Sequence, residues 1–173
     1  MKMLYAYAVA GAVITAVAVW AFLTFPGLLI WAAFVGWASM HHCGGDRAAL
    51  KKTIVCTTFG VVMCWAVGMA VATGVTGLPA PIAAALAAGI AAATIVLVSS
   101  VPSLSATPAI FYGFASGFAF LSQTPGKFSV EAMTAPGLEN VLIVVSVSLI
   151  IGALLGALHV KFGNAMMERQ TTV

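Results

Sequence analysis

Residues 30–40, IWAAFVGWASM, form a short aromatic and glycine segment that decides the fold, because it follows a proline break and lies between long apolar runs. A similar segment, IFYGFASGFAF, fills residues 110–120, eighty positions later (110 − 30). In membrane proteins, short helices broken at corresponding places in the two halves are the best sequence indication of a solute site near the bilayer midplane. The repeated segment therefore predicts two short helices and makes transport the first function to test.

The composition is that of a membrane protein. Of the 173 residues, 62% are hydrophobic and 6% are charged, whereas ordinary soluble domains carry roughly 25% charged residues. No soluble fold of this length could bury so much apolar surface, so we expect an all-α polytopic membrane protein with a single domain over residues 1–173. The three cysteines are an odd number without a CxxC pair, which indicates neither a disulfide framework nor a zinc site.

Six apolar runs follow one another in the order long, short, long, long, short, long. The long runs are residues 4–25, 54–75, 82–101 and 138–160, and the short runs are residues 28–42 and 109–121. Each long run suffices to cross the hydrocarbon core at 1.5 Å per residue, while the short runs lie near the lower limit for spanning. This order predicts six transmembrane segments in two three-helix repeats, about residues 1–78 and 79–173.

The basic residues test this count, because they gather on the cytoplasmic side of membrane proteins. With the N-terminus inside, only Lys127 falls outside. The cytoplasmic set is Lys2, Arg47, Lys51, Lys52, Lys161 and Arg169. We therefore expect both termini in the cytoplasm. Since each repeat has an odd number of segments, the second must enter the membrane with inverted topology. The net charge of +3 then reflects anchoring at the membrane face, and nucleic acid is not expected as a partner.

Two breaks precede the short runs. The first is Pro26-Gly27, and the second is the hydroxyl-rich stretch of residues 101–108, VPSLSATP. Thr107 followed by Pro108 reads as an N-cap with proline at the first helical position. If the second break lies at depth in the membrane, its backbone must line protein or a water-filled path, to which Ser103 and Ser105 would add hydroxyls. The alternative is an ordinary turn at the interface.

Large aromatic residues recur at spacings of three and four in both short runs, so each set forms one helix face. The sets are Trp31, Phe34 and Trp37 in the first run and Phe111, Phe114 and Phe118 in the second. Such faces serve either as packing or an interfacial belt, or as the two walls of a slot that stacks on a flat solute. GxxxG pairs at Gly113/Gly117 and Gly152/Gly156 indicate close helix contacts within or between subunits.

Residues typical of other functions are missing from the middle of the runs. All four acidic residues lie at or beyond the edges of the runs, so no carboxylate is placed for a proton relay or ion coupling. No nucleophile, base and orienting group come together as an enzyme would need, and no cofactor motif is present. His41, His42 and Cys43 lack further ligands, so we expect no metal. His159 could bias gating by pH, and we expect it to cap the C-terminus of the last helix.

The chain resembles a family of small bacterial inner-membrane proteins of unknown function, the YcdZ-like proteins. The resemblance lies in residues 31–36, WAAFVG, the glycine turn of residues 43–45, Lys51-Lys52, Val101-Pro102 and residues 108–113, PAIFYG. It implies a bacterial inner-membrane location and brings no established activity. A proline break before a short aromatic helix is also similar to the pore elements of urea transporters, although this chain is about half their length and lacks a clear copy of their pore motif.

We therefore expect an oligomeric channel or facilitator for small neutral polar solutes, with urea or a related amide favoured, whose partners are the bilayer and further copies of itself. Aromatic residues would set the width, and hydroxyls would replace hydration. The expected pore-lining residues are Trp31, Phe34, Trp37, Phe111, Tyr112, Phe114, Thr15, Thr94, Ser105, Thr107 and Ser116. The alternative function is a structural or assembly subunit of a larger membrane complex.

Overall fold

The computed structural model describes residues 2–168, and the regular secondary structure of this range is helical. The helices are α1 (Met3–Thr24), α2 (Ile30–His42), α3 (Arg47–Ala72), α4 (Ala80–Val98), the 3-10 turn η1 (Pro102–Leu104), α5 (Thr107–Gln123), α6 (Val130–Thr134) and α7 (Val141–Glu168). The predicted all-α class is confirmed. Arg169, which the sequence places in the cytoplasm, lies outside the described residues.

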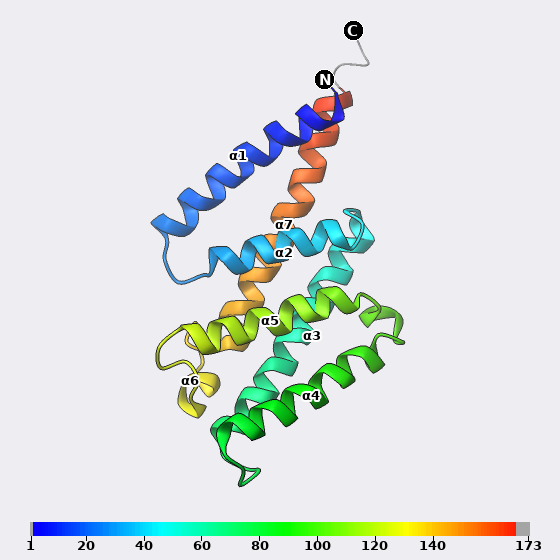
Figure 1. Ribbon diagram of the computed structural model, residues 1–173. Helices are drawn as coiled ribbons and strands as arrows, with labels where there is room; N and C mark the ends of the chain where they lie inside the picture. Colours follow the sequence, from blue (N-terminus) through cyan, green and yellow to red (C-terminus); the bar gives the residue numbers. More distant parts are fainter. Residues whose placement is uncertain (1, 169–173) are drawn as a thin grey trace.

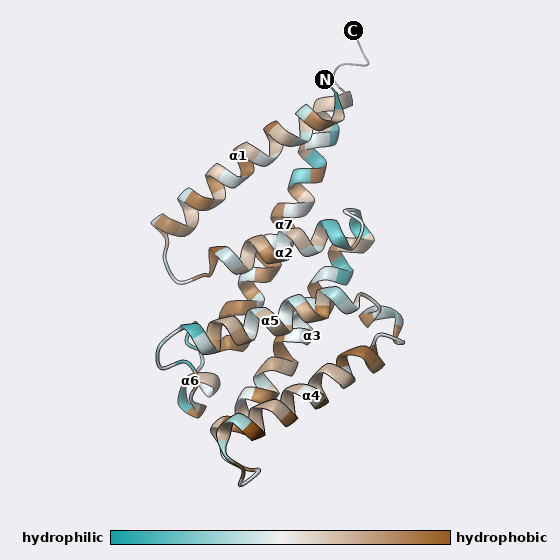
Figure 2. Cartoon of the chain, in the orientation of Figure 1, coloured by the Kyte–Doolittle hydropathy of each residue, from teal (hydrophilic) through white to brown (hydrophobic). Residues whose placement is uncertain are grey.

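Four of the helices, α1, α3, α4 and α7, are long and apolar enough to cross a membrane. Much of α1 and α4 is coloured as hydrophobic in Figure 2, and many large apolar side chains of these two helices are exposed. With 13 and 17 residues, α2 and α5 are shorter. At 1.5 Å per residue α2 extends about 20 Å, less than the roughly 30 Å of a bilayer core. The chain is therefore a membrane protein with four candidate spans and two short apolar helices.

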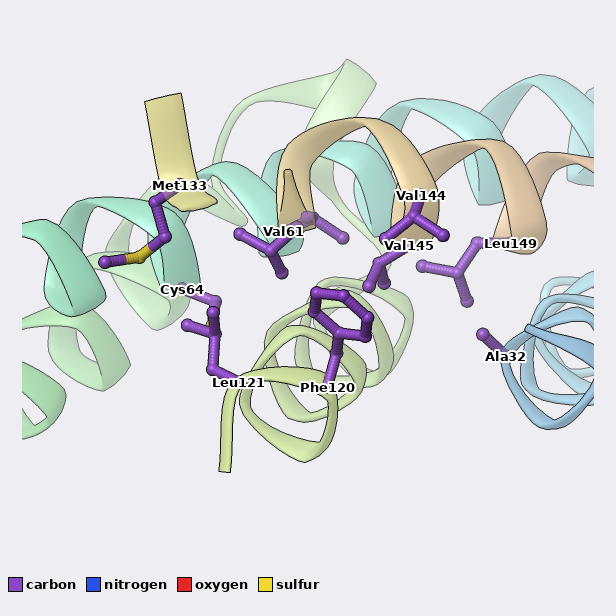
Figure 3. Packing of buried hydrophobic residues seen from close by; sticks show 10 residues of the cluster. Ala32, Val61, Cys64, Phe120, Leu121, Met133, Val144, Val145 and Leu149 are labelled. Carbon is purple, nitrogen blue, oxygen red and sulfur yellow. The ribbon is translucent and has the colours of Figure 1, made fainter. Parts of the chain in front are cut away.

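In Figure 1, α1, α2, α5 and α4 lie one above another, and α7 and α3 cross behind them. The closest helix pairs are α2 with α7 and α5 with α3, while α1 rests on α7 and α4 rests on α3. The core lies where α3, α5 and α7 meet. Figure 3 shows Phe120 of α5 pointing toward Val61 of α3 and Val145 of α7, with Met133 of α6 closing one end.

The helix ends gather at two opposite sides of the molecule. The start of α1, the end of α7 and the loops of residues 43–46 and 99–106 lie on the right in Figure 1, and the other loops lie on the left. Glycines with positive φ shape several of these turns, among them Gly27 (130°) and Gly44 (120°). Asp46 caps α3 by accepting the Ala49 N–H at 2.7 Å. Arg47 and Lys161 line a cavity beside the loop of residues 43–46, and Lys51 and Lys52 line another beside Pro102 and Ser103.

Three expected helix boundaries differ from the structure. The N-cap of α5 is Ala106, one residue before the predicted Thr107, and Pro108 occupies the second helical position. The third long run begins its helix at Ala80 and ends it at Val98. The last helix continues to Glu168, so His159 is an interior residue of α7 and the prediction that it caps the helix is wrong. Its side chain has partners on α1 and α2 instead, which replace the expected interaction with a helix end.

Candidate functional site

Two helix crossings that involve the short helices are made by glycine against backbone. Where α2 crosses α7, a Cβ added to Gly36 would overlap the carbonyl oxygen of Leu149, and one added to Gly152 would overlap that of Ala33. Where α5 crosses α3, a Cβ on Gly113 would overlap the Thr57 carbonyl, and one on Gly60 the Ile110 carbonyl. Small residues allow such close approach in lipid, where packing rather than water exclusion holds helices together. The short helices are therefore held rigidly on the long ones.

The same sequence makes both crossings. Residues 34–39, FVGWAS, contribute Gly36 to the first crossing, and residues 111–116, FYGFAS, contribute Gly113 to the second. These two glycines are 77 residues apart (113 − 36). The sequence comparison indicated an offset of eighty residues, so the offset between corresponding glycine contacts is three residues shorter. On the long helices the corresponding glycines are 92 residues apart (152 − 60). Like residues therefore make like contacts at the two crossings.

The starts of the two short helices are also matched. The backbone N–H of Leu29, which precedes α2, donates to Ser148 Oγ of α7 at 2.9 Å. At the start of α5, Cys56 of α3 lies against the backbone, with its Sγ 3.6 Å from the Ser103 carbonyl oxygen. Positions 56 and 148 are again 92 residues apart (148 − 56). Ser148 thus accepts from a backbone N–H at the start of α2, where such groups lack partners within the helix, while Cys56 donates to a backbone carbonyl of η1, before α5.

A cavity of about 300 Å³ opens between α2 and α5, which run side by side in opposite directions in Figure 1. Its lining residues are Trp31, Val35, Tyr112, Ala115, Ser116 and Ala119. Three of the predicted pore-lining residues, Trp31, Tyr112 and Ser116, thus come together from segments that lie far apart in the sequence. The surface of this cavity is almost wholly apolar and carries no charged side chain.

A second cavity of about 230 Å³ lies at the other end of this helix pair. It is lined by His42, Cys43, Lys52, Ser105, Ala106, Pro108 and Ala109. Tyr112 connects the two cavities, because it lines the first and its hydroxyl lies 2.9 Å from Nδ1 of His42, which lines the second. Of the predicted residues, Ser105 lies here. We call the two cavities and Tyr112 between them the α2–α5 groove.

Other predicted residues lie elsewhere. Trp37 is buried against α7, with its ring 5.3 Å from that of His159. Phe111 and Phe114 stack edge to face at 6.5 Å and pack against the core beside α3. Phe34 is partly exposed beside Trp37. Within each set, some of the aromatic residues therefore lie away from the groove. Both sets contribute more to packing than to the groove.

The predicted hydroxyl residues are also scattered. Thr94 on α4 donates its hydroxyl to the Ile90 carbonyl, and Ser105 donates to the Pro102 carbonyl, so these two hydroxyls already have backbone partners. Thr15 is half-buried on α1, and Thr107 is the first residue of α5. Among the residues that the structure describes, no three His, Cys, Asp or Glu side chains come close enough together to hold a metal ion.

One polar cluster was not predicted from the sequence. Trp37 and His41 of α2, His159 of α7 and the Tyr7 backbone of α1 form a chain of polar contacts of 2.9–3.1 Å. The spacing of four between Trp37 and His41 was a usable signal, because side chains at i and i+4 meet on a helix. The approach of His159 from 118 residues away had no local signal.

One comparison with known proteins identifies a family, and it gives no activity. Neither the curated proteins nor the solved structures include a match to this chain. A family model for proteins of unknown function, DUF1097, matches residues 8–164. This match does not bear on the YcdZ-like name or on the likeness to urea transporters, which stay predictions. The matched range covers both short helices and the groove between them, and the chain belongs to the DUF1097 family.

Proposed function

We propose that this protein is a membrane channel or facilitator for small neutral polar solutes, with urea or a related amide as the favoured solute. The observation that carries the proposal is the α2–α5 groove, in which two cavities lie along two short helices with the Tyr112–His42 contact between them. Solute sites of membrane proteins lie between such short helices, where irregular backbone can face a cavity instead of lipid.

The matched crossings support an inverted repeat of three helices. In this proposal α1, α2 and α3 correspond to α4, α5 and α7, so that α2 on α7 has its counterpart in α5 on α3. The glycine contacts at the two crossings and the polar side chains at the two helix starts follow this correspondence. The opposite directions of α2 and α5 agree with inverted topology. Six crossings would then place both termini in the cytoplasm of a bacterial inner-membrane protein.

The chemistry of the groove favours a flat, neutral solute. Trp31 and Tyr112 provide rings on which a planar amide can stack, and the Tyr112 hydroxyl contacts His42 at the second cavity. The carboxylates of Asp46, Glu131 and Glu139 lie in loops or the short α6, away from this lining. The first cavity, whose surface is apolar, would leave an ion without compensation for its lost hydration, whereas Lys52 lines the second cavity.

A closed path needs a second copy of the chain, because the groove opens at the molecular surface. Trp31 is 39% exposed at its rim. The outward faces of α1 and α4 also leave large apolar side chains uncovered, and these can pack on lipid or on another copy. A homo-oligomer in which neighbouring copies cover the groove would remove it from lipid and complete the path.

Solute flux into liposomes tests the proposal. Purified protein in liposomes should speed volume recovery after an osmotic step with urea, measured by stopped-flow light scattering. Ala115→Trp, which places a large ring in the groove, should return the rate to that of empty liposomes. Ala93→Trp, at an exposed alanine of α4, is the matched control and should leave the rate unchanged. Wild-type rates equal to those of empty liposomes for urea, formamide, ammonia and glycerol would refute the proposal.

The alternative function is a structural or assembly subunit without catalytic activity. The exposed apolar faces of α1 and α4 favour it, because such faces can hold a partner membrane protein. This alternative predicts that another membrane protein co-purifies in fixed stoichiometry and that liposome flux is absent.

A further inference from the structure

Four groups from α1, α2 and α7 meet at one end of the molecule. Trp37 Nε1 donates to His41 Nε2 at 3.0 Å, and the same His41 nitrogen lies 3.1 Å from His159 Nδ1. The other nitrogen of His159, Nε2, lies 2.9 Å from the backbone carbonyl oxygen of Tyr7. Gly11 of α1 leaves room for this imidazole, since a Cβ there would stand 3.2 Å from His159 Nε2.

These contacts fix where the ring protons must be. A carbonyl oxygen only accepts, so His159 Nε2 must carry a proton to bond to Tyr7. The indole N–H of Trp37 only donates, so His41 Nε2 must be bare and accept from it. The remaining contact, between His41 Nε2 and His159 Nδ1, then requires a proton on His159 Nδ1. All three contacts are hydrogen bonds only when His159 carries protons on both ring nitrogens and is a cation, with the single lone pair of His41 Nε2 shared between the Trp37 and His159 N–H groups.

A neutral pair cannot satisfy the same geometry. If His159 keeps its proton on Nε2 alone, its bare Nδ1 faces the bare Nε2 of His41 and two lone pairs oppose each other. If His41 Nε2 carried a proton instead, its N–H would point at the N–H of Trp37, and two donors would oppose each other. We propose that His41 and His159 form a proton-binding site, which takes one proton from water onto His159 Nδ1 and shares it with His41 Nε2.

The surroundings of the pair favour a single positive charge. The rings of Tyr7 and Trp37 each meet the His159 ring in a T-shaped arrangement, with centroids 5.3 Å apart. A second proton would have to go to His41 Nε2, where it would face Trp37 and the cationic His159. The pair therefore binds one proton more readily than a second.

Other titratable groups near the three helices have different partners. On α1, the Tyr7 hydroxyl donates to Asn164 of α7. On α2, Nδ1 of His42 lies 2.9 Å from the Tyr112 hydroxyl. Lys161 of α7 and the pair Asp46 and Arg47 line a neighbouring cavity with Met40, and the Asp46 carboxylate caps α3. Lys2 directly precedes α1. The proton of the pair is thus held by Trp37, the Tyr7 carbonyl and the two imidazoles.

The site lies at one of the two matched helix crossings and not at the other. At the offsets of 77 and 92 residues that relate the two crossings, Trp37 corresponds to Phe114, His41 to Phe118 and His159 to Val67. The two phenylalanines stack at 5.0 Å in an apolar setting. Packing of a long helix on a short one therefore does not need histidine. The polar side chains serve proton binding, which ties α1 and α2 to α7 whether or not a solute passes.

Nitrogen NMR of the histidine rings tests the inference. The chain has three histidines, so the full-length His42→Gln protein, labelled at histidine and held in lipid nanodiscs, reports on His41 and His159 alone. As the pH falls, His159 should become doubly protonated first, while His41 keeps a bare Nε2. The second proton should follow at a pH lower by about one unit or more, as for coupled groups.

Trp37→Phe in this background provides the sharper test. It removes the donor that competes for His41 Nε2, so the neutral pair can form its own hydrogen bond and should bind the first proton less tightly. We expect the first midpoint to fall by about 0.5 pH unit or more. Trp31→Phe removes an indole N–H from the same helix away from the pair, and should leave the midpoint unchanged.

Two results would overturn the inference. One is independent titration of the two histidines, each following the single-site curve seen when the other is replaced by glutamine. The other is an unchanged first midpoint in Trp37→Phe protein whose circular dichroism and elution volume match those of the His42→Gln parent. Either result would show that the histidines do not share a proton.

Discussion

At the scale of single residues, the absence of a side chain matters most. Gly36, Gly113, Gly60 and Gly152 all lie where the backbone of a neighbouring helix fills the space that a Cβ would occupy. Other glycines differ, since Gly89 on α4 has no atom within 4 Å of the position where its Cβ would lie. The same residue type therefore has two distinct roles in this chain, and the contacts separate them.

Gly152→Ala should destabilise the protein. The added methyl group would collide with the Ala33 carbonyl and force α2 away from α7, at a cost of about 1–3 kcal/mol in the free energy of unfolding. Thermal unfolding in detergent, followed by circular dichroism, measures the loss. Gly89→Ala is the matched control and should be neutral or slightly stabilising, because alanine favours helix over glycine by up to about 1 kcal/mol. Equal midpoints for the two variants would contradict this account.

At the scale of elements, the short helices depend on the long ones. Neither α2 nor α5 has a side-chain cap of its own at its start. Ser148 supplies the missing acceptor to α2 from α7, and it also donates its own hydroxyl to the Val144 carbonyl. A helix of 13 residues has little independent stability, so its position is decided by such contacts across the structure.

Ser148→Ala should loosen the start of α2. The Leu29 N–H would lose its acceptor in a buried place, and we expect a loss of about 0.5–2 kcal/mol, as for other helix caps. Hydrogen exchange should increase at residues 29–33, with the core of α3 unaffected. Ser146→Ala, at another buried serine of α7, should leave exchange at residues 29–33 as in the wild type. Increased exchange in both variants would mean that the cap is not the cause.

At the scale of the whole molecule, the open question is how often the chain crosses the bilayer. Four helices are long enough to span, and the proposed repeat adds α2 and α5. The two arrangements differ in the side on which the middle loops lie. With six crossings, the loop after α3 is outside and the loop after α4 is inside. With four crossings these two loops exchange sides.

Labelling of single cysteines distinguishes these arrangements. Thr76→Cys, Ser103→Cys and Glu131→Cys, each in a background that lacks the three native cysteines, place a thiol at an exposed position of a loop or of α6. In intact cells, a maleimide that does not cross the inner membrane should label the first and third positions and should reach Ser103→Cys only after permeabilisation. Labelling of Ser103→Cys but not Thr76→Cys in intact cells would refute six crossings.

The sequence by itself determined the helical class, the membrane setting and the two short aromatic helices, because apolar run length and proline breaks are local properties. Tertiary structure decided the offset at which the two helix crossings correspond, since this offset is set by which glycines meet a carbonyl of another helix. It also decided which predicted residues share a groove, so that Trp31, Tyr112 and Ser116 meet while Trp37 and Phe114 pack elsewhere. The pairing of His41 with His159 depends on the crossing of helices far apart in the chain, and no local pattern specifies such a contact.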